Sequence, residues 1–536
     1  MPRVIIYDTT LRDGTQGEGV HFSVEDKLRI LRELDALGLD YVEGGWPGAN
    51  PRDLAFFSQA KRISLQNARL TAFGSTRRPQ NTPEEDQTLN HLLAAETPAV
   101  AIFGKSWLLH VLEVLRTSPE ENLRLIEDSV AYLKAHGREV IYDAEHFFDG
   151  FAEDPEYALA TLKSAARGGA DWIVLCDTNG GTLPPEAMAA IERARRAVST
   201  PLGVHIHNDV GMAAAISVLA ARAGVEQIQG TFNGYGERCG NANLCTIIPT
   251  LVLKMGLDCA VKPNLHRLTE VSRLISELTN LHPDERQPYV GASAFAHKAG
   301  THVDAIRKNP RTLEHIQPEL VGNRRRILLS DLASRSSILE KIGERYPHLT
   351  KETPEVAALT EELKRLEHLG YQFEAAEASF DLLVRKAFRD YEKAFELKGF
   401  RIIVEKHGEG PTFSEATIKL TVDGVEELTA AEGDGPVNAL DSALRKALGR
   451  FYPEIRDFRL VDYKVRVLEE NRGTAAMVRV LIETSDGRTA WGTVGVSENI
   501  IEASWQALVD SLEYGILRVK EEGRPSEPAP RPPSRA

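Results

Sequence analysis

Eight short runs of β-branched and apolar residues alternate with longer amphipathic stretches through the first half of the chain. The runs predict strands, and the stretches between them have the apolar spacing of helices. The predicted strands are Val4–Asp8, Tyr41–Gly44, Leu70–Gly74, Val100–Gly104, Val140–Ala144, Trp172–Cys176, Gly203–His207 and Gln227–Thr231. Eight βα units within about 260 residues predict one closed (β/α)₈ barrel. An open doubly wound sheet is the alternative, but eight units without a long interruption favour closure.

The composition and the cysteine pattern disfavour a nucleic-acid-binding, membrane-spanning or secreted protein. The 536 residues are 42% hydrophobic and 26% charged, with a formal net charge of −14. No basic stretch carries interleaved aromatics, so no nucleic acid is expected as a partner. No apolar run approaches the roughly 20 residues that span a bilayer, and the first residues enter a strand pattern at once, so neither a membrane span nor a signal peptide is expected. The four cysteines form no CxxC pair, which favours a cytoplasmic protein.

A helical, more charged region follows the predicted barrel, which we assign to residues 1–262. Residues 263–395 are expected to form linker subdomains, with long helices at Pro354–Leu366 and Phe380–Lys393. The stretch His297–Arg335 is rich in His, Arg and Gly and is expected to be largely loop.

The third region, residues 396–520, contains an internal repeat. A unit of three strands and one helix occurs twice, and Asn438 and Asn499 stand at matching positions at the two helix starts. A duplicated α+β module of this kind suggests a ligand-binding or dimer interface. Residues 521–536 are proline-rich and are expected to be a disordered tail.

Two histidines and an aspartate form the strongest chemical feature. His205 and His207 stand two residues apart in the seventh strand, so both side chains face one side. They lie at the strand's carboxyl end, where barrel active sites occur. Asp13 follows the first strand, and a closed barrel brings strands one, seven and eight together. A carboxylate and two imidazoles suit a divalent catalytic ion, and Mg²⁺, Mn²⁺, Co²⁺ and Zn²⁺ are all compatible.

Polar residues after other strands are further candidates. Asn241, in the glycine-rich loop after strand eight, could be a fourth ligand or a substrate contact. Glu145, at the end of strand five, could serve as a general base. Thr178, after strand six, could hydrogen-bond a carboxylate, and Glu43 could orient Arg12. Plain loop hydrogen bonding explains Thr178 and Glu43 equally well.

Together these residues resemble the family of 2-isopropylmalate, homocitrate and citramalate synthases. The matching segments are DTTLRDGTQ, HIHND, NGYGERCGNAN and AFAHKAGTHVDA, and the resemblance covers the chain except its tail. Several stretches are similar to the long (R)-citramalate synthase branch, namely VEGGWPGANPRD, FGSTRRP, FGKSWLLH, DAEHFFDGF and CDTNGGTLP.

The resemblance implies an acyltransferase that condenses acetyl-CoA with pyruvate and water, giving (R)-citramalate and CoA on a route to isoleucine. It also implies a regulatory C-terminal module with isoleucine as the feedback ligand. A homodimer with a shared active site is the implied assembly.

Residue by residue, the resemblance implies that Asp13, His205 and His207 are metal ligands, with Asn241 as an additional one. Arg12 matches a residue that polarises the oxoacid carbonyl. The implied substrate-binding residues are Arg12, Gln16, Glu43 and Thr178.

The resemblance also assigns the acetyl-CoA side of the reaction. Glu145 matches the acid that takes the methyl proton, and His302 matches a linker histidine that generally serves a partner subunit's site. One departure stands out, because Leu313 lies where the family commonly has a tyrosine near the thioester.

Other functions stay open at this stage. The acceptor could be 2-oxoisovalerate, as in 2-isopropylmalate synthase, or a dicarboxylic oxoacid, as in homocitrate synthase. Aldol-type lyases use a similar metal site and a cysteine in the glycine-rich loop, where this chain has Cys239. A non-catalytic amino-acid sensor is a third reading, which the intact metal set disfavours.

Overall fold

The computed structural model describes residues 3–279, 281–297, 302, 305–306, 308–327, 335–343, 345–468 and 476–523. The chain divides into two compact units, one formed by 1–296 with 314–326 and the other by 297–313 with 327–536. The predicted domain limits at residues 262, 395 and 520 stay predictions. The expected disorder of the tail beyond residue 523 lies outside the described residues.

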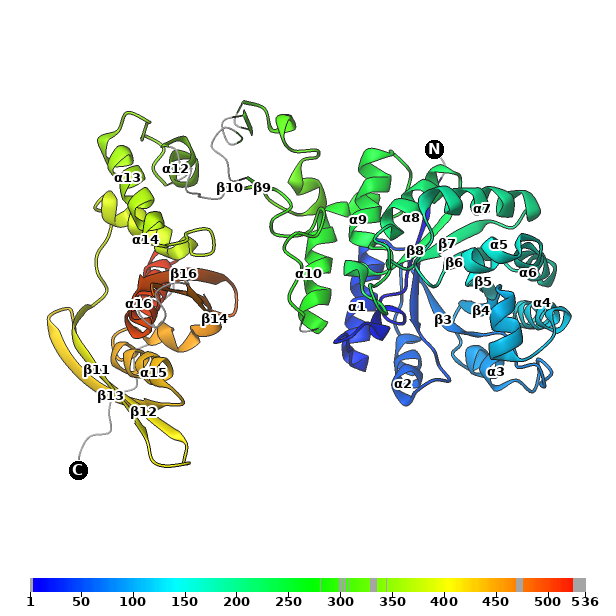
Figure 1. Ribbon diagram of the computed structural model, residues 1–536, viewed down its shortest axis with the longest axis horizontal. Coiled ribbons are helices and arrows are strands. Elements are labelled where there is room, and N and C mark those ends of the chain that lie inside the picture. Colours follow the sequence, from blue (N-terminus) through cyan, green and yellow to red (C-terminus); the bar gives the residue numbers. More distant parts are fainter. Residues whose placement is uncertain are drawn as a thin grey trace. The chain divides into compact units, whose positions relative to one another are not determined.

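The first unit is a closed barrel of eight parallel strands in sequence order, which confirms the predicted fold class (Figure 1). Strand β1 pairs with β8 and closes the barrel. The strands are β1 (Ile5–Asp8), β2 (Tyr41–Gly45), β3 (Arg69–Ser75), β4 (Ala99–Lys105), β5 (Glu139–Glu145), β6 (Trp172–Asp177), β7 (Leu202–Ile206) and β8 (Gln227–Gly230).

Helices cover the outside of the barrel and bury its apolar outer face. They are α1 (Val24–Leu37), α2 (Pro51–Ala60), α3 (Gln87–Ala94), α4 (Pro119–Ala135), α5 (Phe147–Glu153), α6 (Pro155–Gly168), α7 (Pro184–Ala197), α8 (Ala213–Arg222), α9 (Leu244–Pro249) and α10 (Leu268–Thr279). Helix α1 begins where the sequence predicts, because the Ser23 hydroxyl accepts the Asp26 amide and the Asp26 carboxylate accepts the Ser23 amide.

Alternate residues of the strands point into the barrel and fill it. Tyr7, Ala101, Ile141 and Val174 belong to this interior cluster and are fully buried. Because side chains occupy the lower barrel, the free space lies at the carboxyl ends of the strands, where the loops can shape a pocket.

In the second unit, the described residues include the helices α12 (Arg335–Ile342), α13 (Pro354–His368) and α14 (Glu377–Ala387), which precede the duplicated module. Each half of the module is a three-stranded antiparallel sheet with one helix packed on it. The halves are β11 (Glu396–Lys406), β12 (Thr412–Val422), β13 (Val425–Gly433) with α15 (Pro436–Leu448), and β14 (Arg459–Val467), β15 (Val478–Ser485), β16 (Ala490–Ser497) with α16 (Ile500–Glu521). The predicted repeat is thereby confirmed.

Two local predictions differ from the structure. The helix expected at Phe380–Lys393 is α14, which ends at Ala387 because Arg389 adopts a left-handed conformation with φ of 56°. The two asparagines at matching sequence positions also differ in role. Asn499 caps α16 by accepting the Ile501 amide, whereas Asn438 lies inside the first turn of α15 and accepts the amide of Asp434.

Across the described part of the chain, no helix is both long enough and apolar enough to cross a membrane.

Candidate active site

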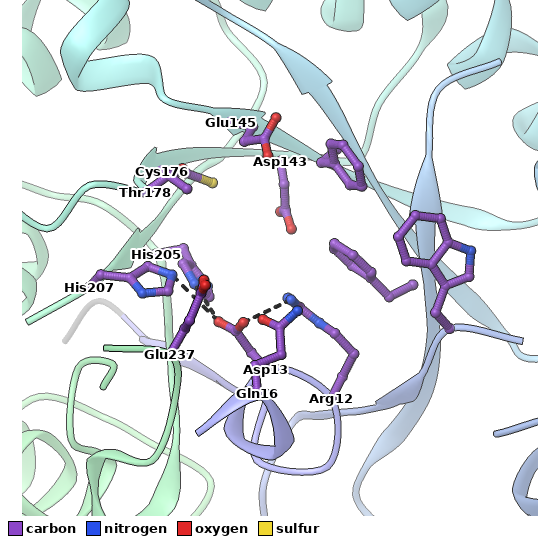
Figure 2. Close-up of a pocket in the computed structure, with 13 residues that line it drawn as sticks. Arg12, Asp13, Gln16, Asp143, Glu145, Cys176, Thr178, His205, His207 and Glu237 are labelled. Atoms are coloured by element: carbon purple, nitrogen blue, oxygen red, sulfur yellow. Dashed lines mark hydrogen bonds and ion pairs between the residues drawn. The ribbon is translucent and has the colours of Figure 1, made fainter. Parts of the chain in front are cut away.

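A pocket opens at the carboxyl ends of the barrel strands, with a volume of about 250 Å³ (Figure 2). Its walls combine ionisable, aromatic and small polar side chains from strands β3 to β7 and from the loops after β1, β2, β6, β7 and β8. The lining residues are Arg12, Asp13, Gln16, Trp46, Phe73, Phe103, Asp143, Glu145, Cys176, Thr178, His205, His207 and Glu237.

The turn after β1 presents Asp13 to the pocket. The Asp8 carboxylate accepts the Thr10 amide at 3.0 Å and the Thr10 hydroxyl at 2.6 Å, which bends the chain directly after the strand. The same hydroxyl accepts the Phe232 amide of the β8 loop at 2.8 Å. The β1 turn is therefore tied to the β8 loop, and a short 3₁₀ turn, Gly14–Gln16, then starts with Asp13 at its N-cap.

Asp13, His205 and His207 converge as the sequence predicts. The Asp13 Oδ2 atom lies 3.0 Å from His205 Nε2 and 3.7 Å from His207 Nε2, and the three ligand atoms lie within 4.8 Å of one another. Ligands at about 2.0–2.2 Å from one ion are separated by about 3–3.5 Å, so this spacing fits a divalent cation. The triad is a possible metal site whose donors, one carboxylate and two imidazoles, match several metals.

Burial and charge set the protonation of these groups. Burial alone would raise the pKa of Asp13, but the charge of Arg12 and the hydrogen bond with His205 outweigh it and hold this pKa well below its usual range. Burial and the neighbouring His205 lower the pKa of His207 to about 4. Near neutral pH, Asp13 is therefore a carboxylate and His207 is neutral, which are the forms that bind metal ions.

Asn241 lies beside the triad, in the glycine-rich loop after β8. Its backbone forms an isolated β-bridge with that of His207, and its side-chain Oδ1 atom is buried without a hydrogen-bond partner. The loop needs two of its glycines: a Cβ at Gly236 would lie 2.2 Å from Asn241 Nδ2, and one at Gly240 would lie 1.9 Å from the Gly234 carbonyl oxygen. An unsatisfied buried oxygen next to the triad is compatible with the predicted fourth ligand.

Arg12 is held over the pocket by two carboxylates. Its Nε donates to Glu43 Oε1 at 2.5 Å and its Nη1 to Asp13 Oδ1 at 3.0 Å, and the guanidinium lies 3.8 Å from the centre of the Phe73 ring. Glu43 is fully buried and also accepts the Tyr7 hydroxyl at 2.6 Å. Glu43 therefore does not line the pocket, and its geometry suits orienting Arg12 better than contacting a substrate.

Glu145 and Thr178 line the opposite part of the pocket (Figure 2). Glu145 forms an ion pair with Lys105, which comes from the end of the neighbouring strand β4. The Thr178 hydroxyl oxygen accepts the His146 amide at 3.0 Å, so its own hydrogen is free to donate to a ligand. The glycine-rich loop is anchored on this side, because Arg238 donates to the Thr178 carbonyl oxygen at 2.7 Å.

Sequence reasoning did not find the aromatic wall of the pocket. Trp46 contacts Phe73 and Phe103 edge to face, with ring centres 5.8 and 5.9 Å apart, and the two phenylalanine rings stack at 5.6 Å. Trp46 directly follows β2, and Phe73 and Phe103 belong to β3 and β4. Inward-pointing aromatics of barrel strands look like core in the sequence, so no signal distinguished them.

Gln229 is a second residue that sequence reasoning missed. It is fully buried in β8, and its Oε1 lies 3.0 Å from His205 Nδ1. Its amide nitrogen donates to Gln227 Oε1 at 3.1 Å, which fixes the orientation of the amide. Because Oε1 can only accept, His205 carries a hydrogen on Nδ1, which leaves Nε2 as the atom that would bind a metal ion in place of its hydrogen bond with Asp13.

We expect Gln229→Ala to weaken metal affinity by about 10- to 100-fold, the usual cost of losing a group that orients a ligand. Gln227→Ala, one step further from His205, should cost less. Titration of the metal-free proteins with Mn²⁺ in a calorimeter measures both affinities. An unchanged affinity in Gln229→Ala would exclude the orienting role.

Two predicted residues belong to the second unit. His302 and Leu313 are both exposed there. The proposed role of His302 in a partner's site stays a prediction. Leu313 brings no polar group to the position where the family commonly has a tyrosine.

Three family models match the chain. The HMGL-like model matches residues 3–275, the homocitrate synthase post-HMGL domain-like model matches 289–370, and the LeuA allosteric (dimerisation) domain model matches 374–516.

Curated relatives match over almost the whole length. The (R)-citramalate synthase of Aquifex aeolicus is 53% identical over 524 residues, covering 97% of this chain and 99% of the relative. The (R)-citramalate synthase of Geobacter sulfurreducens is 54% identical over 522 residues, with the same coverage. Among solved structures, the HMG-CoA lyase of Bacillus subtilis has a TM-score of 0.46 at 21% identity, covering 52% of this chain and 96% of the lyase.

Proposed function

The chain belongs to the (R)-citramalate synthase family, and we propose that it condenses acetyl-CoA with pyruvate and water to give (R)-citramalate and CoA. The observation that carries the proposal is one pocket that holds a possible metal triad, an oriented arginine and a separate carboxylate for proton removal. A condensation of this kind needs all three, because one substrate must become electrophilic while the other loses a proton.

Arg12, Asp13 and the two histidines are the residues that we assign to activation of the oxoacid. A divalent ion held by this triad would act as a Lewis acid on the keto group and offset the negative charge that develops on its oxygen. Arg12 is fixed by Glu43 and Asp13, so it can add charge stabilisation at the same oxygen without reorganising. Thr178 has a free hydroxyl hydrogen for the oxoacid carboxylate, and Gln16 lines the same pocket.

Glu145 is the proposed base for the acetyl-CoA methyl group. Its ion pair with Lys105, at the end of the neighbouring strand β4, positions the carboxylate at the pocket. It lines the pocket across from the triad, so a thioester methyl between them would face the oxoacid carbonyl (Figure 2).

The second unit supports the regulatory part of the proposal. Its match to an allosteric dimerisation domain fits a homodimer, and we propose isoleucine as the feedback ligand of this module. His302, exposed in the second unit, is the proposed contribution of one subunit to its partner's active site.

The aromatic wall favours a small acceptor. Trp46, Phe73 and Phe103 pack against one another at one side of a pocket of about 250 Å³. Such a wall suits the methyl group of pyruvate. We expect a bulkier isopropyl group to fit beside these packed rings less well, and a second carboxylate would find only aromatic side chains on this wall.

The proposal predicts an acceptor profile. CoA release from acetyl-CoA should be fastest with pyruvate, slower with 2-oxobutyrate, and lower by about 10- to 200-fold or more with 2-oxoisovalerate, because one extra methylene costs about 1–3 kcal/mol in a closely packed pocket. A thiol-reactive dye measures free CoA, and the same series with isoleucine tests feedback. Faster release with 2-oxoisovalerate or 2-oxoglutarate would reject pyruvate as the acceptor. Formation of acetyl-CoA and pyruvate from citramalyl-CoA, with no CoA release in the forward direction, would indicate a lyase.

A further inference from the structure

Asp143 is a buried carboxyl group in the pocket that the reaction described above does not use. It lies two residues before Glu145 on β5, so both side chains point into the barrel, and both line the pocket (Figure 2). Asp143 is 4% exposed, and its Oδ1 atom is buried without a hydrogen-bond partner. An unpartnered carboxyl oxygen in a side chain that lines a pocket can form a hydrogen bond with a ligand there.

We propose that Asp143 acts as a neutral carboxylic acid that donates a hydrogen bond to the thioester oxygen of acetyl-CoA while Glu145 removes the methyl proton. This inference rests on the proposed function, because it assigns a group to the substrate atom that the condensation leaves without a partner. Arg12 serves the keto oxygen of the other substrate, and Lys105 is paired with Glu145.

The surroundings of Asp143 favour its neutral form. Glu43 faces it from β2 and disfavours its charged form, whereas Arg12 from the β1 turn, His205 from β7 and a hydrogen bond with Gln229 from β8 favour that form. No lysine, arginine or histidine in the described ranges forms an ion pair with it at 4 Å or less. Burial, reinforced by Glu43, raises the pKa of Asp143 to about 7, and a bound substrate would exclude water further.

Glu145 has the opposite environment, although it belongs to the same strand face. Its side chain is 22% exposed and it is paired with the lysine. Two carboxyl groups in one site with different surroundings commonly divide the roles of acid and base. Here Glu145, which is partly exposed and paired with Lys105, is the base, and Asp143, which is buried and has no ion-pair partner in the described ranges, is the hydrogen-bond donor.

The dimensions of the acetyl group fit the two carboxyls. Residues two apart on a strand are separated by about 6.6 Å, whereas the methyl carbon and the thioester oxygen are about 2.4 Å apart. Two hydrogen-bond distances of about 2.6–3.2 Å, each inclined to the line between these two atoms, cover the remaining separation of about 4.2 Å.

The atoms balance without an additional reactant. Glu145 takes the proton, the C–H electrons form a C=C bond, and the carbonyl electrons move to the oxygen that accepts the Asp143 hydrogen bond. When the new C–C bond forms, the thioester carbonyl returns and Asp143 keeps its proton.

The test compares Asp143→Asn with Asp143→Ala in the full-length, metal-loaded enzyme. Asparagine keeps a hydrogen-bond donor of the same shape, so its kcat should stay within about tenfold of the parent, whereas alanine should lower kcat by about 10²–10³-fold. The neutral acid is the active form, so parent activity should fall as the pH rises through the pKa of Asp143. The asparagine variant should lack that alkaline decline.

Deuterium uptake into the acetyl-CoA methyl group, measured by mass spectrometry, reports on the same step and should follow the same order. Metal content and thermal midpoint establish that the variants are folded. An asparagine variant as slow as alanine would mean that the carboxylate itself is needed, and an alanine variant at parental rate would mean that Asp143 contacts no reacting atom. Either result overturns the proposal. CoA release by the parent enzyme with pyruvate reports separately on the proposed function.

Discussion

Replacing His207 with alanine is expected to remove metal binding and turnover together. Its Nε2 atom lies 3.7 Å from Asp13 Oδ2, and the ring is neutral near pH 7, so it supplies one of three lone pairs that converge on one point. Loss of a Lewis acid removes several kcal/mol of charge stabilisation, and each 1.36 kcal/mol is a tenfold change in rate. We therefore expect kcat to fall by at least about 10³-fold. Atomic absorption of the purified protein measures the metal, and CoA release measures turnover.

His136→Ala is the matched control. That histidine is exposed at the end of α4, and its Nδ1 contacts the Tyr132 carbonyl oxygen. It should leave metal content and kcat unchanged. A His207→Ala protein that is free of metal and still turns over at the parental rate would refute the metal assignment.

The barrel could be predicted from sequence because its signal is repeated eight times. Each βα unit is weak evidence, but the closure of β1 on β8 follows from their number and spacing alone. The residues at which helices end are harder to predict from the sequence. Residues 388–398 include no glycine or proline, so nothing indicated that Arg389 would take a left-handed conformation and end α14 early.

The candidate site also contains some residues that the sequence predicts and others that it does not. Asp13, His205 and His207 are predictable because polar residues at strand ends are unexpected in a packed barrel, and closure brings them together. Gln229 and Asp143 were not found, because a buried polar side chain in a strand shows its role only through its partners. The Gln229 amide reaches His205, and the Asp143 carboxyl lies beside Gln229 with its Oδ1 atom unpartnered, and neither fact can be read from spacing.

Replacing Glu145 with glutamine is expected to slow the reaction while leaving both binding steps in place. Glutamine has nearly the same shape but cannot accept the methyl proton, and loss of a general base typically costs about 10²–10⁴ in rate. Metal content and the KM for pyruvate should change little, because Glu145 belongs to neither the triad nor the Arg12 contacts. The fall should therefore appear in kcat, and deuterium exchange into the acetyl-CoA methyl group should fall by the same factor.

Glu237→Gln is the matched control for this charge change. Glu237 also lines the pocket, but its side chain is 58% exposed and its carboxylate is paired with Arg238, so we expect it to keep most of its activity. If deuterium exchange in Glu145→Gln matched the parent while CoA release fell, the proton would be leaving to another group, and Glu145 would act after the condensation instead of before it. If both rates matched the parent, Glu145 would have no part in the chemistry, and its ion pair with Lys105 would only hold the ends of β4 and β5 together.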